Sequence, residues 1–400
     1  MRSDMSDPEE PSEAMGGHRL LYVVNDAPFF LSHRLALAVR ARRAGYDVTV
    51  ASPEDAAAFD LLRSEGLTAV AIPLDRGGMN PLKDARVLRH LWRLMARIRP
   101  DVVHLVTSKA IIYGGIAARL QGIPALGAFS GMGYVFSNRS AKTRALKALT
   151  MTLYRLACRH PRFLGLFQNE DDRRAAVDAG VMRMERTRIA PGSGTDLKVI
   201  RATPLPRGRP VVLLPARMLR QKGVAEFAAA AEILRSRGVD ALFRLQGDPD
   251  PRNPSSFTEE ELIALARAPN VEWNPHTSDI AAALSRAHVV ALPSHGGEGL
   301  PKTLIDAAAA GRPAVATDVP GCRDAIVPGK TGVLCRPRDA ADLADRIAAL
   351  LADGPRLDAM ARAARQHAEA HFDVGRIADM HMDLYGELAV AAPRRGRAGP

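Results

Sequence analysis

The feature that most constrains the fold of this 400-residue chain is a regular alternation of short apolar runs with longer amphipathic segments. Apolar runs such as 19–24 and 211–215 have the length of strands, and apolar residues in the segments between them recur every three or four positions. This alternation predicts repeated strand–helix units, in which parallel strands are covered by helices on both faces. The predicted fold class is therefore α/β, with doubly wound parallel sheets whose ligand loops follow the carboxyl ends of the strands.

The alternation starts twice, once near residue 18 and again near residue 211. Between the two starts lies the Pro- and Arg-rich segment Ala202–Pro210, which has the composition of a linker. The predicted division is a disordered tail (1–17), a Rossmann-like domain (18–200), a linker (201–210), a second Rossmann-like domain (211–370), a C-terminal helix packing back on the first domain (371–390) and a disordered basic tail (391–400).

Individual elements are predicted by the same periodicity. Strands are expected at 19–24, 47–51, 70–73, 101–106, 124–129, 164–168, 211–215, 241–245, near 271, 288–293, 313–317 and 332–335. Helices are expected at 31–44, 82–98, 113–120, 140–163, 169–180, 224–237, 259–266, 280–285, from Pro301 to before Gly311, at 340–351 and at 374–388.

Charge and cysteine content bear on partners and compartment. The net charge of +11 indicates an anionic partner, which can be a membrane surface, a nucleic acid or a phosphorylated substrate. The three cysteines show no metal-ligand or redox spacing, and this favours a reducing, cytoplasmic compartment. We expect no signal peptide and no membrane span, because no apolar run approaches the roughly 18 to 20 residues that a bilayer needs.

The segment 140–163 alternates basic residues, including Lys142, Arg144 and Lys147, with leucines at helical spacing. A basic amphipathic helix can lie on the anionic surface of a membrane. It can equally be a helix that packs on the sheet and exposes a basic face to water. We favour contact with the cytoplasmic face of the membrane, as a peripheral protein.

The stretch 294–317 holds the densest group of functional signals. A Gly-broken loop separates two strand-length apolar runs and leads into a helix that begins near Pro301 and ends at Gly311. Free N–H groups at such a helix start, together with the helix dipole, favour an anion such as a diphosphate. Glu298 lies in the loop and Asp306 in the helix, and a carboxylate can accept two hydrogen bonds from neighbouring hydroxyls. A helix with one solvated acid remains the alternative.

The two acids and the surrounding Glu-Gly-Leu-Pro-Lys and Gly-x-Pro-x-Val-Ala-Thr strings resemble the E-x7-E signature of the large retaining glycosyltransferase family 4, which has the GT-B fold. Asp306 stands where the family has Glu, so its reach is one methylene shorter. The resemblance runs from about His18 to Tyr385, and similar strings occur in the branch that builds polyprenyl-linked bacterial oligosaccharides. Two departures are Ser130-Gly131 in place of a cleft His and Asn25-Asp-Ala-Pro in place of a Gly-Gly pair.

The resemblance implies a role for each matching residue of the second half. Arg217 and Lys222 would hold the donor diphosphate, where two cations stabilise the charge of a leaving group. Glu298 would hold hydroxyls of the donor sugar. The other donor-binding residues implied are Gly299 and Leu300 through backbone N–H groups, Thr303 through its hydroxyl, and Asp306 through the ribose.

Candidates in the first half follow or flank predicted strand ends. They are His33, His104, Lys109 and Ser130, which would face an acceptor across the cleft of the GT-B fold. A strand-end histidine is as often structural as catalytic, so the histidines keep a structural alternative.

The expected activity is transfer of a sugar from a UDP-sugar to a saccharide. The favoured acceptor is a saccharide linked to a polyprenyl diphosphate in cell-surface polysaccharide assembly, and such a lipid-like acceptor is the reason for placing 140–163 on a membrane. The resemblance implies retention at the anomeric carbon and no cofactor or metal. Asp248-Pro-Asp250 spells the DxD motif of another glycosyltransferase fold, but its position favours an ordinary turn.

Two other functions stay open. The alternatives are a nucleotide-sugar epimerase of the same fold and a non-catalytic nucleotide-sugar-binding protein. No nucleic acid is expected as a partner.

Overall fold

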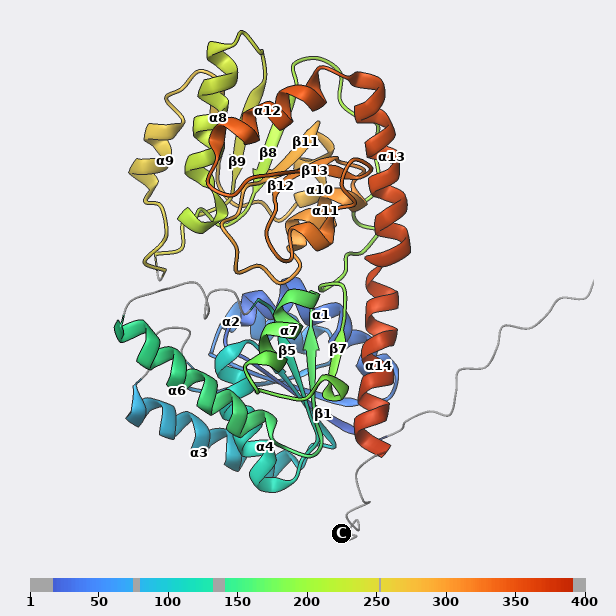
Figure 1. Ribbon diagram of the computed structural model, residues 1–400. Helices are drawn as coiled ribbons and strands as arrows, with labels where there is room; N and C mark the ends of the chain where they lie inside the picture. The colour runs from blue at the N-terminus through green and yellow to red at the C-terminus, as the bar shows by residue number, and fades with distance from the viewer. Residues whose placement is uncertain (1–16, 75–79, 132–140, 252, 391–400) are drawn as a thin grey trace, which may run out of the picture. The chain divides into compact units, whose positions relative to one another are not determined.

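The computed structural model describes residues 17–74, 80–131, 141–251 and 253–390 of the chain (Figure 1). The chain divides into two compact units. Unit 1 comprises Met1–Gly127, His160–Phe163 and His381–Pro400, and unit 2 comprises Ala128–Arg159 and Leu164–Met380. The predicted domain boundaries stay predictions.

The first sheet has seven strands in the order β3-β2-β1-β4-β5-β6-β7. Its strands are β1 (Arg19–Val24), β2 (Asp47–Ser52), β3 (Thr68–Ala71), β4 (Val102–Val106), β5 (Ala125–Phe129), β6 (Phe163–Phe167) and β7 (Thr187–Ile189). The helical segments are α1 (Ala27–Arg43), α2 (Ala56–Ser64), α3 (Pro81–Ile98), the π-helical turn η1 (Ala110–Gly114), α4 (Gly115–Gln121), α6 (Ala141–Cys158), α7 (Glu170–Asp178) and η2 (Met184–Arg186).

The second sheet has six strands in the order β10-β9-β8-β11-β12-β13. They are β8 (Val211–Pro215), β9 (Leu242–Gln246), β10 (Val271–Asn274), β11 (Val289–Leu292), β12 (Ala314–Thr317) and β13 (Gly332–Cys335). The helical segments are η3 (Arg220–Lys222), α8 (Val224–Ser236), α9 (Glu259–Leu265), α10 (Ile280–Ser285), α11 (Lys302–Ala309), η4 (Arg323–Ala325), α12 (Ala340–Leu351), α13 (Gly354–His371) and α14 (Val374–Val390).

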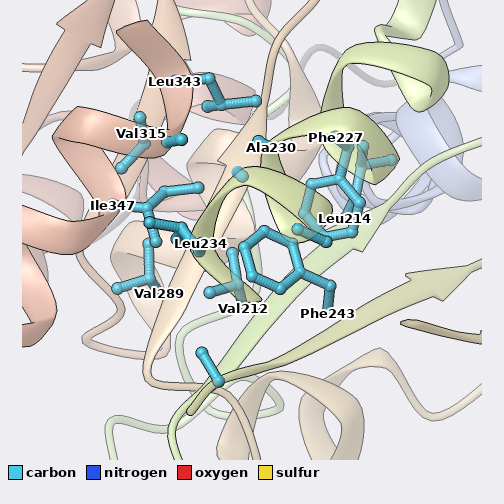
Figure 2. Close-up of a cluster of buried hydrophobic side chains, with 14 of the residues drawn as sticks. Val212, Leu214, Phe227, Ala230, Leu234, Phe243, Val289, Val315, Leu343 and Ile347 are labelled. Atoms are coloured by element: carbon cyan, nitrogen blue, oxygen red, sulfur yellow. The ribbon is translucent and has the colours of Figure 1, made fainter. Parts of the chain in front are cut away.

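Both faces of the second sheet are buried, and the side chains of its strands alternate between two cores. Val212 and Leu214 of β8 point into one core, where Phe227 and Leu234 of α8 pack against them (Figure 2). Leu213, between them in sequence, belongs to the other core. Successive strand residues face opposite sides of a sheet, so apolar residues are needed at every position when helices cover both faces. The predicted class of doubly wound parallel sheets is confirmed.

A polar cluster lies within the apolar interior of unit 1. Tyr385 of α14 has its hydroxyl 2.7 Å from the hydroxyl of Tyr22 on β1 and 2.7 Å from Nδ1 of His104 on β4. His381, one turn earlier, stacks on the ring of His104. The last helix is thus fixed on the first sheet by hydrogen bonds as well as by apolar contact.

Candidate functional site

Each sheet has the strand order of a doubly wound fold, in which the chain reverses its direction of travel across the sheet at one point. In the second sheet that point lies between β8 and β11. Two loops leave the carboxyl ends of these strands, 216–223 after β8 and 293–301 after β11. Ligands of such sheets bind in the crevice outside this point, so the fold brings Arg217, Lys222 and Glu298 to the expected place.

The loop after β8 is held against the end of β11 by a close backbone approach. Lys222 ends the short turn η3, and Gly223 follows with a left-handed φ of 76°. A Cβ on Gly223 would lie 2.1 Å from the carbonyl oxygen of Pro293. Only glycine fits this position, and the fit sets how far Lys222 lies from the loop after β11.

The loop after β11 also depends on glycine. Gly296 and Gly297 have φ values of 114° and 79°, which other residues rarely adopt. They turn the chain so that Glu298 points back toward β8. Pro301 then occupies the N-cap position of α11, with α11 running from Lys302 to Ala309.

Glu298 is the centre of a buried group of hydrogen bonds. Lys222 Nζ lies 2.7 Å and 2.9 Å from its two carboxylate oxygens. The hydroxyl of Ser294, a residue with no exposed surface, donates to Glu298 Oε1 at 2.7 Å. The carbonyl of Ser294 in turn accepts from the Thr317 hydroxyl at the end of β12. Residues of both loops, Lys222 after β8 and Ser294 after β11, therefore hold the carboxylate.

These contacts decide the charge of Glu298. Burial by itself raises the pKa of a carboxyl group, but the Lys222 ammonium and the hydrogen bonds from Lys222 and Ser294 outweigh it. The net effect lowers the pKa of Glu298 below its usual value. The side chain is thus an anion at neutral pH and can accept strong hydrogen bonds.

Arg217 lies beside this group and is restrained by an acid of the predicted turn. Its Nη1 is 2.8 Å from Asp250 Oδ2, and half of the Arg217 side chain is exposed. Asp248 accepts from the backbone N–H of His276 at 2.7 Å. Both acids of the Asp-Pro-Asp sequence therefore have protein partners. Among the residues that the structure describes, no group of three or more His, Cys, Asp or Glu side chains could hold a metal ion.

Thr303 and Asp306 lie on α11. The Thr303 hydroxyl donates to the carbonyl of Pro215 at 2.8 Å, which ties the helix to the end of β8. The hydroxyl hydrogen of Thr303 therefore already makes a hydrogen bond within the protein. Asp306 is 5% exposed, and Lys302 Nζ lies 2.8 Å from its Oδ1. Lys302 was not predicted as a site residue, although its spacing of four residues from Asp306 is that of a helical ion pair.

Of the two N–H groups predicted to bind the donor, that of Leu300 has a partner within unit 2, and the neighbouring Gly299 is bonded through its carbonyl. The N–H of Leu300 donates to Oε1 of Gln168 at 2.9 Å, and the carbonyl of Gly299 accepts from Nδ2 of Asn169 at 3.0 Å. Gln168 and Asn169 follow β6, at the end of the predicted strand 164–168 and the start of the predicted helix 169–180, and neither was predicted as a site residue. A ligand that takes the Leu300 N–H would replace Gln168.

His104 is a correction to the expected placement. It is the middle residue of β4 and has no exposed surface, because the helix α14 covers it. Burial, with His381 and Arg34 nearby, holds its pKa well below the usual value for histidine. The prediction that it flanks a strand end is wrong, and its hydrogen bond to Tyr385 is the structural alternative.

The other first-half candidates lie on α1 and in the segments that follow β4 and β5. His33 stacks on Phe29 in α1, with ring centroids 4.1 Å apart. Lys109, after β4, has its Nζ 3.7 Å from Asp84 Oδ1. Ser130 directly follows β5 and is partly exposed. Their predicted contact with an acceptor stays a prediction.

The expectation that the segment 140–163 contacts a membrane concerns a part of the chain that the structure describes incompletely. The side chains of Lys142, Arg144 and Lys147 lie outside the described residues. In the described half of α6, Leu149 and Leu156 are 50% and 45% exposed. No described helix is long and apolar enough to cross a membrane.

Comparison with known families adds independent information. Residues 209–353 match the model of glycosyl transferases group 1, and residues 19–164 match that of glycosyl transferase 4-like domains. The two matches cover most strands and helices of both sheets, and the first contains Arg217, Lys222, Glu298 and Asp306.

Two curated relatives span most of the chain. One is N,N'-diacetylbacillosaminyl-diphospho-undecaprenol alpha-1,3-N-acetylgalactosaminyltransferase of Campylobacter jejuni, 27% identical over 341 residues, which are 82% of this chain and 88% of the relative. The other is UDP-Gal:alpha-D-GlcNAc-diphosphoundecaprenol alpha-1,3-galactosyltransferase of Escherichia coli, 24% identical over 357 residues, which are 86% of this chain and 90% of the relative.

Solved structures show the same fold at low sequence identity. Sucrose-phosphate synthase from Thermosynechococcus elongatus has a TM-score of 0.76 and 19% identity, covering 94% of this chain and 100% of that one. Anabaena HepE in complex with UDP-glucose has a TM-score of 0.72 and 19% identity, covering 92% and 99%. These likenesses agree with the predicted GT-B fold.

Proposed function

Because the chain belongs to the group 1 glycosyltransferases of the family-4 type, we propose that it transfers a sugar from a UDP-sugar to a saccharide linked to a polyprenyl diphosphate. The observation that carries the proposal is the Lys222–Glu298 pair beside Arg217, at the point of the second sheet where such folds bind ligands. The UDP donor rests on the names of the Escherichia coli relative and of the HepE complex. The acceptor rests on the two undecaprenol-linked relatives.

Arg217 and Lys222 are proposed to hold the donor diphosphate. Both lie in the loop that follows β8, and the Lys222 side chain is 19% exposed, so a bound phosphate there would be largely out of water. A cation in such a place stabilises the negative charge that grows on the leaving group. Arg217 would turn from Asp250 toward the phosphates, since its exposed half leaves room for that motion.

Glu298 is proposed to bind hydroxyls of the donor sugar, with the N–H groups of Gly299 and Leu300 near the phosphate. Glu298 is anionic and fixed by Ser294, so it would also favour positive charge on the sugar ring. Asp306 would accept from the ribose, sharing its charge with Lys302. Thr303 keeps its position in the proposal, but its proton would have to leave Pro215 to reach a phosphate.

The proposed chemistry proceeds with retention at the anomeric carbon. The bond from that carbon to the diphosphate oxygen breaks, and the acceptor hydroxyl forms a new bond on the same face. The hydroxyl proton passes to the departing phosphate oxygen, and UDP leaves. Glu298 is tied to Lys222 and Ser294, which supports a role in binding rather than as a covalent nucleophile.

No cofactor or metal is part of the proposal. Arg217 and Lys222 supply the positive charge that a divalent cation supplies in enzymes with a functional DxD motif, and Asp248 and Asp250 are engaged elsewhere. Transfer in the presence of a strong chelator is expected to equal transfer without it.

The proposed location is the cytoplasmic face of the membrane, where the protein would act as a peripheral enzyme. A lipid-linked acceptor supports this, as does the basic amphipathic sequence of α6. His33, Lys109 and Ser130 remain the candidates for contact with the acceptor.

The test is ligand-dependent thermal stabilisation across a panel of nucleotide sugars. A ligand that binds only the folded state raises its stability, so UDP and the correct UDP-sugar should raise the melting temperature. Replacing Arg217 or Lys222 by Ala should weaken UDP binding and lower transfer by about a hundredfold or more. Unchanged UDP affinity in both variants would remove these residues from the site. Donor consumption without any acceptor would favour the epimerase alternative.

A further inference from the structure

Helix α3 in unit 1 has an outer face that exposes large apolar side chains. Its inner side packs in the core through Val87, Leu91 and Leu94. On the outer side, Leu82 is 85% exposed and Trp92 is 45% exposed. Scattered exposed leucines are normal, but a half-exposed tryptophan and an almost fully exposed leucine on one helix need a physical explanation.

The same face carries a stripe of arginines. Arg86, Arg89, Arg93 and Arg97 are exposed and recur every three or four residues, so they lie along one side of the helix. None of them forms an ion pair with a residue that the structure describes. The single acid of the helix, Asp84, is buried and faces Lys109. The charge of this face is therefore positive and uncompensated.

Helix α4 extends the face. It packs beside α3 (Figure 1). Gln121 Nε2 donates to the carbonyl of Trp92 at 2.8 Å. Leu120 of α4 is 69% exposed next to the basic side chain of Arg119. We call this surface the α3–α4 face and define it by Leu82, Arg86, Arg89, Trp92, Arg93 and Leu120.

We propose that the α3–α4 face docks on an anionic lipid bilayer. Arginines attract the surface of anionic lipids, tryptophan favours the headgroup region, and exposed leucines become buried among acyl chains. A nucleic acid would pair with the arginines but leave Leu82 and Leu120 in water, so lipid accounts for more of the surface. The inference rests on the proposed function in one respect: a lipid-linked acceptor would bring the enzyme to a membrane.

The test uses the full chain and sedimentation with vesicles of phosphatidylcholine, with and without phosphatidylglycerol, containing no acceptor and no donor. Binding is expected only with phosphatidylglycerol and should fall as salt rises. The double variant Arg89→Gln/Arg93→Gln should lose about tenfold or more in affinity, as expected for two basic residues at an anionic surface. The matched control, Arg356→Gln/Arg362→Gln, removes the same charge from α13 and should bind as the unaltered protein does.

A second readout reports on the apolar part of the face. The chain has two tryptophans, so Trp273→Phe leaves Trp92 as the sole tryptophan fluorophore. Its emission should shift to the blue on anionic vesicles. Trp92→Ala should weaken the binding that survives high salt. The melting temperature of Arg89→Gln/Arg93→Gln should match the parent, because both side chains are exposed.

Three outcomes would overturn the proposal. In the first, Arg89→Gln/Arg93→Gln leaves vesicle binding unchanged, whereas Lys142→Gln/Arg144→Gln/Lys147→Gln abolishes it. This result would assign the membrane contact to α6. Another is binding without any change in Trp92 emission. The third is tighter, face-dependent binding of duplex DNA than of vesicles. Transfer to a water-soluble acceptor is assayed separately, so failure of the docking surface and failure of the proposed activity give different results.

Discussion

At the scale of single residues, the Lys222–Glu298 pair sets the state of the candidate site before any ligand binds. Each charge is largely buried, with 19% and 12% of the two side chains exposed. Leaving either charge without its partner would cost several kcal/mol, and the Lys222 ammonium helps to hold the pKa of Glu298 below its usual value. Ser294 adds a hydrogen bond that leaves Glu298 little freedom to rotate. A donor would thus meet a carboxylate already held in one orientation.

Glu298 and Asp306 are expected to fail in different ways when altered. Glu298→Gln keeps the shape of the side chain but removes its negative charge. We expect this variant mainly to lower kcat, because interactions that strengthen in the transition state contribute to kcat. Asp306→Ala should instead raise the KM for the donor, because the ribose does not change during transfer. The increase should correspond to about 1.5–3 kcal/mol, the range for a hydrogen bond to a charged group. Steady-state kinetics with the donor varied measure both effects.

The ion pair of Lys302 with Asp306 means that Asp306→Ala needs control substitutions at the same position. Asp306→Ala leaves the Lys302 ammonium without its partner at 2.8 Å, so Asp306→Asn and Asp306→Glu should be measured beside it. Asp306→Glu tests whether the shorter acid is a local adaptation. If Asp306→Ala changes neither constant while Glu298→Gln abolishes activity, Asp306 has no ribose role.

At the scale of elements, most strands and helices were predictable because both sheets are buried on two faces. A strand such as β8 then has apolar residues at every position, and its ends are visible in the sequence. Helix α13 was missed, although Asp353 caps it and Leu357, Met360, Ala364 and Ala368 form its buried side. Helix α1 begins at Ala27, four residues before the predicted start, because Asp26 acts as its N-cap.

The site was less predictable than the fold, and the reason is packing between distant segments. Arg217, Lys222 and Glu298 follow strand ends, so strand order alone brings them together. The burial of His104 depends on α14, which returns to the first sheet 281 positions later in the chain. Likewise, the contact of Gln168 with Leu300 joins residues 132 positions apart. The return of the C-terminal helix to the first domain was predicted, but periodicity and motifs do not identify which residues such contacts bury.

Gly223 offers a test of how one element positions another. Gly223→Ala places a methyl group 2.1 Å from the Pro293 carbonyl, at a φ of 76° that alanine rarely adopts. We expect the loop after β8 to move away from β11, which separates Lys222 from Glu298. Folding stability should fall by more than the roughly 1–2 kcal/mol of a left-handed alanine, and UDP affinity should fall with it. Denaturant unfolding and calorimetric titration measure the two effects.

Gly238→Ala is the matched control for this change. Its φ is 75°, but no atom lies within 4 Å of the added Cβ. This variant should show the conformational cost alone, with unchanged UDP affinity. Equal losses in the two variants would mean that the contact with Pro293 does not position Lys222.

At the scale of the whole molecule, the interior contains several histidines that burial keeps neutral. The pKa values of His104, His160, His288 and His367 are all lowered, with burial as the largest cause in each case. They lie in different parts of the chain, near β4, β6, β11 and α13. Their combined titration is therefore a property of the entire fold and not of the candidate site.

The predicted consequence is a loss of stability in mild acid. Below a pH of about 6.5 the unfolded chain takes up protons on these histidines, whereas the folded chain resists them. The unfolding free energy should then decrease as pH falls, by at most about 1.4 kcal/mol per pH unit for each histidine that stays neutral in the fold. Glu298 should contribute only below its ordinary value of 4.5, because its pKa is lowered.

Urea unfolding between pH 7.5 and 5.5 measures this slope without involving Glu298. His104→Gln removes a histidine with no exposed surface. The slope of the unfolding free energy against pH should then decrease by the equivalent of up to one bound proton, even if the variant is less stable at pH 7.5. The slope, unlike the absolute stability, separates titration from the lost hydrogen bond to Tyr385. A parent protein whose stability is constant or rises toward pH 5.5 would contradict the neutral state of the buried histidines.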